Sequence, residues 1–326
     1  MAHPAVAIPA LSVVIPVLNE APNLERLHRE LSDSLTKLGR SCEVLFVDDG
    51  STDESFEILA RLQRADPRVR VVQLRRTFGQ TAAFAAGFAL ARAPIVVTAD
   101  GDGQNDPADI AALVTRLDQG FDVVCGWRQD RKDAFVSRRL PSMIANRLIS
   151  WATGVRLNDY GCSLKAFRAE VVKPLRLYGE MHRFLPALAS EYGARIAELP
   201  VNHRARAAGR SKYGIGRTVR VLLDLLTVRF LASYATRPLQ IFGLVGGVMG
   251  IAGAAVLGYL GYVKIFQHAE LSNRPLVLFG ILLTFTGLQL VTLGLLAEML
   301  ARTYHESQGK PVYVIRQVLP PSADAG

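Results

Sequence analysis

Short apolar runs alternate with amphipathic stretches over the first hundred residues of the chain. Strand-like runs lie within 11–20, 42–55, 69–74 and 94–100, and stretches with helical spacing of apolar residues lie between them, at 23–35, 55–63 and 81–93. This alternation predicts a mostly parallel sheet covered by helices on both faces, because parallel strands need crossover connections. The predicted fold class is therefore α/β.

Two long stretches near the C-terminus carry no charged residue, Leu239–Val263 and Leu276–Ala297. As helices, each is long enough to cross a hydrocarbon core of about 30 Å. The GxxxG spacings Gly243/Gly247 and Gly246/Gly250 are typical of close helix–helix contact in membranes. These features favour a transmembrane hairpin over the alternative, two buried core helices of a soluble protein.

The pattern divides the chain into four parts. An α/β domain over 1–214 is expected to lead into a basic amphipathic helix at 215–236, a membrane region at 237–301 and a tail at 302–326. The stretch 134–154 also alternates basic and apolar residues, as helices in membrane interfaces do. Ordinary surface helices are the alternative for both amphipathic stretches. Within the tail, 310–319 is expected to form a short strand that packs on a neighbouring subunit.

Charge is distributed unevenly along the 326 residues, whose net charge is +9. Residues 1–125 hold 12 Lys/Arg and 17 Asp/Glu (net −5), residues 126–237 hold 21 and 8 (net +13), and the rest holds 5 and 4 (net +1). A basic block just before an apolar span fits a cytoplasmic domain that meets anionic lipid headgroups. Nucleic-acid binding is the alternative, but it leaves the two apolar stretches unexplained.

The N-terminus and the cysteines bear on the compartment. The start "MAHPAVAIPA" lacks the basic residues and long apolar run of a signal peptide, so the first domain is expected in the cytoplasm. The widely spaced Cys42, Cys125 and Cys162 indicate reduced thiols rather than a disulfide framework or a zinc site.

Acidic residues follow two of the predicted strands, Asp48 and Asp49 after one and Asp100 and Asp102 after another. Ligands of parallel α/β sheets bind beyond the carboxyl ends of the strands, so these acids are expected to face a crevice. Gln104 extends the series, and carboxylate and amide oxygens suit Mg²⁺ or Mn²⁺, which also bind substrate phosphates. The alternative is a solvated acidic turn, because Asp–Gly pairs are common in turns.

Several motifs occur in the order seen in family 2 glycosyltransferases, namely "VVIPVLNE", "VDDGSTDES", "RRTFGQTAAFAAGF" and "TADGDGQNDP". Over nearly its whole length the chain resembles the polyprenyl-phosphate branch of this family. The segments "RQDRKDAF", "NDYGCSLKAFR", "GRSKYG" and "KPVYVIRQVL" resemble the bacterial undecaprenyl-phosphate 4-deoxy-4-formamido-L-arabinose transferases of lipid A modification. The resemblance implies a GT-A type nucleotide-binding domain in a bacterial inner-membrane enzyme that assembles as a homo-oligomer, most often a tetramer.

The resemblance also implies roles for particular residues. Uridine is expected at Pro16, Leu18, Glu20 and Asp48, with tyrosine common in the family where Leu18 stands. The metal and the diphosphate are expected at Asp100, Asp102 and Gln104, around Gly101, where the family often has alanine. The acceptor phosphate is expected at Arg128, Arg138 and Ser142, with Arg204, Arg210 and Lys212 nearby. Asp159 is expected to line the donor-sugar pocket, and Asp102, Asp159 and Arg128 are the catalytic candidates.

The implied reaction is inverting, metal-dependent transfer of a sugar from a UDP-sugar to undecaprenyl phosphate, with 4-deoxy-4-formamido-L-arabinose as the first candidate sugar. A phosphate monoester has a second pKa of about 6, so the acceptor is largely a dianion at neutral pH and needs no strong general base. Holding two anions together needs cations, which the basic segment 126–237 supplies. A divalent cation offsets the charge that builds on the departing UDP.

Other functions fit parts of the pattern. Glucose, mannose or N-acetylhexosamine donors, as in dolichyl-phosphate mannose synthases, fit the same layout. A nicotinamide oxidoreductase is disfavoured because no GxGxxG follows the first strand. A processive polysaccharide synthase usually has a QxxRW motif, and neither Trp127 nor Trp151 lies in one. The alternative from another class is a non-enzymatic membrane scaffold or lipid-carrier transporter, although two spans are few for a transport path.

Overall fold

A computed structural model describes residues 8–129, 146, 150, 153–177, 181–204, 238–267, 275–307 and 312–320. The chain divides into two compact units, residues 1–228 with 311–326 and residues 229–310. Each unit is described by itself. The amphipathic helix expected at 215–236 and most of the stretch 134–154 lie outside the described residues.

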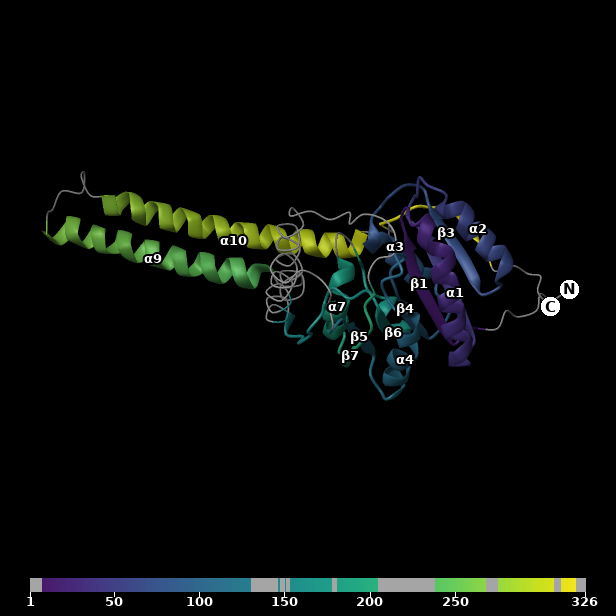
Figure 1. Ribbon diagram of the computed structural model, residues 1–326. Helices are drawn as coiled ribbons and strands as arrows, with labels where there is room; N and C mark the ends of the chain where they lie inside the picture. The colour runs from purple at the N-terminus through teal and green to yellow at the C-terminus, as the bar shows by residue number, and fades with distance from the viewer. Residues whose placement is uncertain are drawn as a thin grey trace. The chain divides into compact units, whose positions relative to one another are not determined.

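The first unit is built on one eight-stranded sheet with the order β7-β5-β6-β4-β1-β2-β3-β8 (Figure 1). The strands are β1 (Leu11–Val17), β2 (Cys42–Asp48), β3 (Val69–Leu74), β4 (Ile95–Thr98), β5 (Val123–Trp127), β6 (Lys165–Arg168), β7 (Ile196–Pro200) and β8 (Ile315–Leu319). Strands β1 to β4 are parallel to their neighbours among themselves, and so are β5 and β7, whereas β6 and β8 run antiparallel to theirs. The α/β prediction of a mostly parallel sheet is therefore confirmed.

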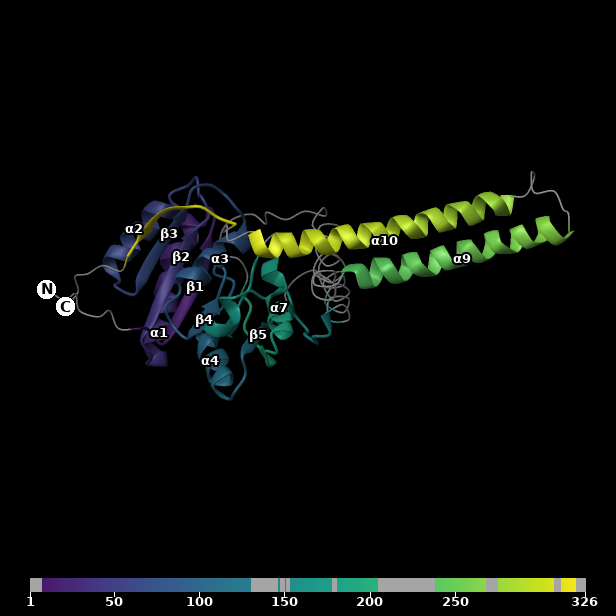
Figure 2. The ribbon, with the colours of Figure 1, turned by 180° about the vertical axis from the view of Figure 1, so that it is seen from behind.

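Helices cover both faces of the sheet, as Figure 2 shows from the opposite side. They are α1 (Ala21–Leu38), α2 (Ser55–Ala65), α3 (Gln80–Leu90), α4 (Ile110–Asp118), α6 (Ala169–Val172) and α7 (Leu185–Glu191), with 3-10 turns η1 (Pro107–Asp109) and η3 (Met181–Arg183). Alternate residues of β1 point to opposite faces of the sheet and pack against different helices. Val13, Ile15 and Val17 pack in one core cluster with α1, α2 and α4, while Val14 faces Gly87 of α3 on the other side.

The central strands β1 and β4 are fully buried because both of their faces are covered. Every residue of β1 is buried, as is typical of a parallel strand between two helical layers. Helix α3 is apolar nearly all round, and its small residues let it approach the sheet closely. Gly87 has no room for a side chain, since an added Cβ would overlap a methyl group of Val14.

A buried ionic network ties the sheet together near the amino ends of the parallel strands. The carboxylate of Glu43 on β2 accepts the Ser12 hydroxyl (2.6 Å), the Arg92 backbone N–H (2.7 Å), Arg92 Nε (2.8 Å) and Arg70 Nη1 (2.9 Å). Burial acts to raise the pKa of Glu43, but these hydrogen bonds outweigh it and hold the pKa below its usual range. Glu43 therefore stays charged in the core.

The C-terminal strand β8 closes the edge of the sheet beside β3. It pairs antiparallel with β3 of the same chain, with Val71 opposite Leu319 and Gln73 opposite Gln317. The expectation that this strand packs on a neighbouring subunit is therefore wrong for this structure. The physical reason is that β3 is an edge strand with unpaired backbone groups, which the chain's own tail can reach and satisfy.

The second unit is a pair of long helices, α9 (Pro238–Gln267) and α10 (Pro275–Ser307), which lie side by side (Figures 1 and 2). Within them Phe242–Gln267 and Pro275–Ala297 are long and apolar enough to cross a membrane. The helices touch through glycines, since an added Cβ on Gly246 would lie 2.6 Å from the carbonyl oxygen of Gly287. Gly287 likewise abuts Gly250, so the Gly246/Gly250 pair makes the contact, whereas Gly247 faces open space.

Candidate active site

The candidate site lies at one edge of the sheet, where five strand ends meet. The carboxyl ends of β1, β2, β4 and β5 share this edge with the amino end of the antiparallel β6. The loops that follow these strands, together with residues 159–164 before β6, are therefore brought together from distant parts of the sequence. The acids of the sequence motifs lie in these loops, as the parallel sheet predicts.

Asp100 is fixed from two sides just after β4. Its Oδ1 accepts the Gln80 side-chain N–H (2.8 Å) and its Oδ2 accepts the Ser163 hydroxyl (2.6 Å). Burial raises the pKa of Asp100, and the neighbouring charge of Asp102 raises it further, against the opposing effects of Ser163, Arg128 and Lys165. The two carboxylates are thus close enough to repel each other, an arrangement that a bound cation would stabilise.

Asp102 is buried within a tight turn. Its Oδ1 accepts the Gln104 backbone N–H (3.1 Å), and only 7% of the residue is exposed. The turn passes close to β1, since an added Cβ on Gly101 would lie 2.9 Å from the Pro16 carbonyl oxygen. This close approach gives a physical reason for glycine at a position where the family often has alanine.

Gln104 lies beside the segment that follows β7. Its carbonyl oxygen accepts the Arg204 backbone N–H (3.0 Å), and a bridge pairs Asn105 with His203. The Arg204 guanidinium contacts Glu30 (2.5 Å) and Asp106 (2.8 Å). Arg204 is therefore near the acidic turn, as expected, but its charge is engaged by two carboxylates.

The two aspartates after β2 differ in what their oxygens contact. Asp49 accepts the backbone N–H groups of Phe78 (2.7 Å) and Gly79 (2.9 Å), so it fixes the loop before α3. Asp48 accepts the Ser51 N–H (3.0 Å) with Oδ1, while its buried Oδ2 has no hydrogen-bond partner among the described residues. Buried oxygens normally accept a hydrogen bond, so Asp48 rather than Asp49 has an oxygen available to accept from a ligand.

The loop after β1 folds against the start of α2. Asn19 adopts a left-handed conformation (φ 52°), and its side chain accepts the Thr52 N–H (2.8 Å). Glu20 accepts the side-chain amide of Asn23 (2.8 Å). Pro16 lies within β1 and is buried in the sheet. Leu18 and Glu20 follow the strand and are partly exposed, at the same edge as Asp48.

Arg128 and Asp159 form a bidentate ion pair at the end of β5. Arg128 Nε lies 2.7 Å from Asp159 Oδ2, and Nη2 lies 2.9 Å from Oδ1. The side chains are 15% and 3% exposed. Burial acts to lower the pKa of Arg128, but the hydrogen bonds and charge of Asp159 raise it, so the guanidinium is always charged. The pair uses two of the five N–H donors of Arg128.

The structure adds residues that the sequence did not single out. Gln80 and Ser163 hold Asp100, and the buried Lys165 donates to the carbonyl oxygens of Cys162 and Tyr160. His182 Nδ1 lies 2.7 Å from the Thr81 hydroxyl at the start of α3. Gln80 and Ser163 fall within the motifs "RRTFGQ" and "NDYGCS", which was the available signal. Arg138, Ser142, Arg210 and Lys212 lie outside the described residues.

Residues 12–176, just over half of the chain, match the family model described as glycosyl transferase family 2. The chain belongs to glycosyltransferase family 2. As a member of this family it is an enzyme, which excludes the non-enzymatic scaffold and carrier hypotheses. The resemblance drawn from the motifs is confirmed.

Curated relatives of this glycosyltransferase match over nearly its whole length. It is 42% identical to dodecaprenyl-phosphate galacturonate synthase from Rhizobium johnstonii, over 97% of this chain and 94% of that protein. It is 39% identical to undecaprenyl-phosphate 4-deoxy-4-formamido-L-arabinose transferase from Pseudomonas aeruginosa, over 96% and 91%. The corresponding transferase from Salmonella paratyphi B is 36% identical, over 98% and 96%.

Among solved structures, the glycosyltransferase is similar to glucosyl-3-phosphoglycerate synthase from Mycobacterium tuberculosis, crystallised with Mn²⁺, UDP and glucosyl-3-phosphoglycerate. The TM-score is 0.52 at 21% identity, over 70% of this chain and 86% of that one. At this identity the likeness shows the fold, and it confirms the GT-A type domain.

The acidic turn offers two carboxylates, those of Asp100 and Asp102, to a divalent cation. Across the described residues, no group of three or more His, Cys, Asp and Glu side chains could hold a metal ion. Mg²⁺ does not need such a group, since it takes one or two carboxylates and completes its shell with water and substrate phosphates. The paired carboxylates of Asp100 and Asp102, with mutual repulsion that raises the pKa of Asp100, fit such an ion.

Proposed function

We propose that this glycosyltransferase moves a sugar from a UDP-sugar to undecaprenyl phosphate, with inversion at the anomeric carbon and with Mg²⁺ or Mn²⁺ as cofactor. The observation that carries the proposal is 36–42% identity, over more than nine-tenths of each chain, to enzymes named for polyprenyl-phosphate sugar products. The match covers 96–97% of this chain and so extends over the apolar helices, which supports a membrane-borne acceptor. The proposed sugar is 4-deoxy-4-formamido-L-arabinose, and galacturonate is the second candidate because of the R. johnstonii relative.

The nucleotide would bind between the loops after β1 and β2. The unpartnered Oδ2 of Asp48 supports uracil binding, because the N3–H of uracil is a donor that this buried oxygen can accept. Pro16, Leu18 and Glu20 would form the rest of the uridine pocket. Asp49 suits this role less well, because each of its oxygens already accepts a backbone N–H group.

The diphosphate and its cation would bind at the acidic turn. Three carboxylates, Asp100, Asp102 and Asp159, face two cations, Arg128 and Lys165, which leaves a net charge of −1. A divalent cation held by Asp102, Asp100 and the Gln104 amide would change this to +1, a charge suited to an incoming diphosphate. When bound, the cation supplies charge neutralisation for the departing UDP.

Arg128 and Asp159 would hold the reacting groups in line. The phosphate dianion is already a competent nucleophile, so the chain's task is to position it beside another anion rather than to remove a proton. The remaining N–H donors of Arg128 are suited to a phosphate oxygen, while Asp159 fixes the guanidinium plane. Arg138, Ser142, Arg204, Arg210 and Lys212 are proposed as further phosphate contacts from the basic segment.

A membrane-borne acceptor is supported by where the chain leaves the catalytic sheet. The segment toward α9 departs beside the acidic turn, where Arg204 pairs with Gln104. The chain re-enters at β8, whose first residue Ile315 pairs with Leu74 at the carboxyl end of β3. Both connections therefore begin at the edge that holds the acids, and a lipid phosphate needs access to this edge.

We place the enzyme in the bacterial inner membrane, with α9 and α10 spanning it and the catalytic domain in the cytoplasm. The proposed organisation is a domain over 1–214, an interface helix at 215–236, spans within 237–301 and a tail at 302–326. Arg64 is exposed on α2, so a cysteine introduced there tests the orientation. In a chain carrying Cys42→Ser, Arg64→Cys should react with a membrane-impermeant maleimide only after the inner membrane is opened.

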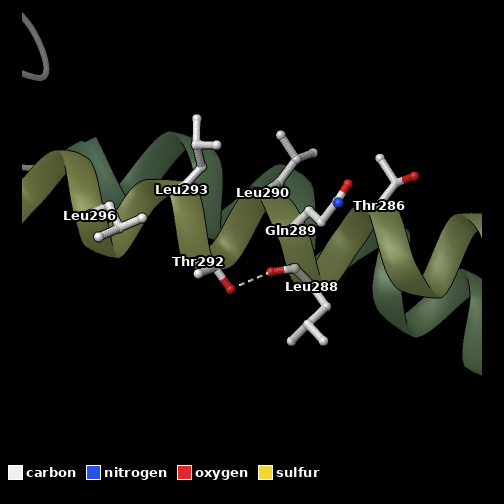
Figure 3. A pocket seen from close by; sticks show the side chains of 7 residues that line it. All are labelled: Thr286, Leu288, Gln289, Leu290, Thr292, Leu293 and Leu296. Atoms are coloured by element: carbon white, nitrogen blue, oxygen red, sulfur yellow. Dashed lines mark hydrogen bonds between the residues drawn. The ribbon is translucent and has the colours of Figure 1, made fainter.

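Self-association, as a tetramer, is proposed through the outer face of α10 (Figure 3). A shallow groove of about 450 Å³ on this helix is lined by Thr286, Leu288, Gln289, Leu290, Thr292, Leu293 and Leu296. Gln289 lies two residues beyond Gly287, about 200° around the helix and so opposite the α9 contact. An exposed amide near the middle of an apolar span gains from a polar partner, and two copies of Gln289 can supply one to each other. Gln289→Leu should reduce the detergent-solubilised complex to smaller species by light scattering, whereas Leu295→Ala, at an exposed α10 residue outside the groove, should not.

The function is tested with the purified full chain, undecaprenyl phosphate and a panel of UDP- and GDP-sugars, with Mg²⁺, Mn²⁺ or chelator. The expected result is chelator-sensitive transfer from a UDP-linked formamido-arabinose or galacturonate. Transfer from UDP-glucose or GDP-mannose alone would keep the reaction class and replace the sugar. No transfer from any donor to the lipid phosphate would overturn the proposed acceptor.

A further inference from the structure

Glu198, on the edge strand β7, contacts the loop that carries Asp159. Its Oε1 accepts the backbone N–H groups of Asn158 (3.0 Å) and Asp159 (2.9 Å). Its Oε2 accepts the Asn158 backbone N–H (3.0 Å) and side-chain N–H (2.7 Å). One carboxylate therefore binds two successive backbone amides and a side-chain amide, which fixes the direction of the chain entering Asp159.

The strands β5 and β7 give Glu198 and Arg128 a common frame. They pair in parallel, with Cys125 opposite Glu198 and Trp127 opposite Pro200, and Arg128 follows directly after β5. Arg128 holds the Asp159 side chain, while Glu198 holds the Asp159 backbone. Asp159 is thus fixed at both ends by residues from two neighbouring strands.

A charged residue on an edge strand can also serve only to discourage edge-to-edge association. Such a residue points into solvent and has no fixed partners. The side chain of Glu198 instead satisfies three N–H groups of a loop about 40 residues away in sequence, and charge-assisted bonds to backbone N–H groups are among the stronger hydrogen bonds in proteins. The geometry fits a role in the site better than a role at the edge.

We propose that Glu198 is a positioning residue for sugar transfer, which acts by fixing the Asp159 loop and, through Asp159, the plane of the Arg128 guanidinium. The proposal rests on the proposed function in assigning Arg128 and Asp159 to the reacting groups. It adds a residue that contacts no substrate and belongs to none of the motifs that placed the site.

The test compares Glu198→Ala and Glu198→Gln with Glu170→Ala, which removes an exposed carboxylate on α6 away from the site. Displacing a positioned group by about 1 Å costs on the order of 100-fold in rate, so Glu198→Ala should lower kcat/KM by roughly 10- to 100-fold, mostly through kcat. Glu198→Gln keeps an oxygen where Oε1 accepts both backbone amides, and it should restore most of the lost activity. Glu170→Ala should match the unmodified enzyme.

A double-substitution cycle separates positioning from general loss of structure. In an Arg128→Ala background, where there is no guanidinium to orient, Glu198→Ala should cause little further loss of transfer. If the two losses instead multiply, Glu198 does not act through Arg128 and the proposal is overturned. Equal activity of Glu198→Ala and the unmodified enzyme would overturn it as well.

Hydrogen exchange supplies a readout that does not depend on transfer. In Glu198→Ala the amides of Asn158 and Asp159 should exchange about tenfold faster or more, because hydrogen bonds to a charged group are lost. Peptides from β1 and α1 should be unchanged. If the unmodified enzyme transfers no sugar but Glu198→Ala still speeds exchange at 158–159, only the proposed function is contradicted. Unchanged exchange at 158–159 would overturn the positioning role itself.

Discussion

Replacing Glu43 by alanine should destabilise the catalytic domain more than any surface ion-pair substitution. The Glu43 side chain is 2% exposed, and its removal leaves the Arg70 guanidinium, which is 12% exposed, with the Leu90 carbonyl but without a carboxylate partner. The Ser12 hydroxyl and the Arg92 N–H lose their acceptor as well. Breaking a buried ion pair by deleting one partner costs about 3–5 kcal/mol. For a domain of this size, that loss corresponds to a Tm lower by roughly 6–20 °C.

The matched control is Glu25→Ala. Glu25 pairs with Arg61 at 3.2 Å, but both side chains are about 60% exposed, so the expected loss is ~0–1 kcal/mol. The assay is thermal unfolding of the detergent-solubilised chain at several pH values. The pKa of Glu43 is lowered in the folded state, so its contribution is present above the usual glutamate pKa and is lost as pH falls through the folded value. A Tm for Glu43→Ala within about 2 °C of the Glu25→Ala control would refute this reasoning.

Three other substitutions test separate parts of the structure. Asp102→Asn should lower the rate of sugar transfer by at least ~100-fold. It should not lower Tm, because it removes the charge that repels Asp100. Activity within tenfold of the unmodified enzyme would contradict the metal assignment. Gly87→Ala should cost about 1–3 kcal/mol in an unfolding assay, since its Cβ overlaps Val14, and an unchanged Tm would show that α3 can shift. Burial acts to raise the pKa of Asp66, but hydrogen bonds from His28 and Arg68 outweigh it and lower the pKa. Asp66→Asn should therefore destabilise the protein at neutral pH, and progressively less as pH falls through the acid range. An equal loss of stability at all pH values would argue against a stabilising role for the Asp66 charge.

The sequence was sufficient to predict the parallel half of the sheet, because β1 to β4 are apolar runs separated by helices with clear periodicity. It was not sufficient for β5, β6 and β7. These strands are short, and β6 is an antiparallel insertion of four residues, which a local pattern cannot distinguish from a loop. The partner of β8 was also mispredicted, since the choice between the chain's own β3 and another subunit depends on contacts far apart in sequence.

In the candidate site, too, features set by neighbouring residues could be predicted from the sequence, whereas contacts between distant residues could not. Asp48, Asp100 and Asp102 follow strands, so the fold rules alone place them at one edge. That Asp48 rather than Asp49 has an unpartnered oxygen depends on the loop at Phe78 and Gly79, thirty residues further on. The Arg128–Asp159 ion pair depends likewise on a turn 31 residues away. The family resemblance supplied both residues but not their contact.

The pairing of β8 with β3 has a consequence for the order in which the protein is made. β3 is complete after residue 74, but its outer neighbour is synthesised only after both apolar helices, at residues 315–319. Until then the outer backbone groups of β3 have no strand beside them, and closing the sheet requires a loop of about 240 residues, which contains the whole helical hairpin. The catalytic sheet is therefore finished last, when the hairpin has already left the ribosome.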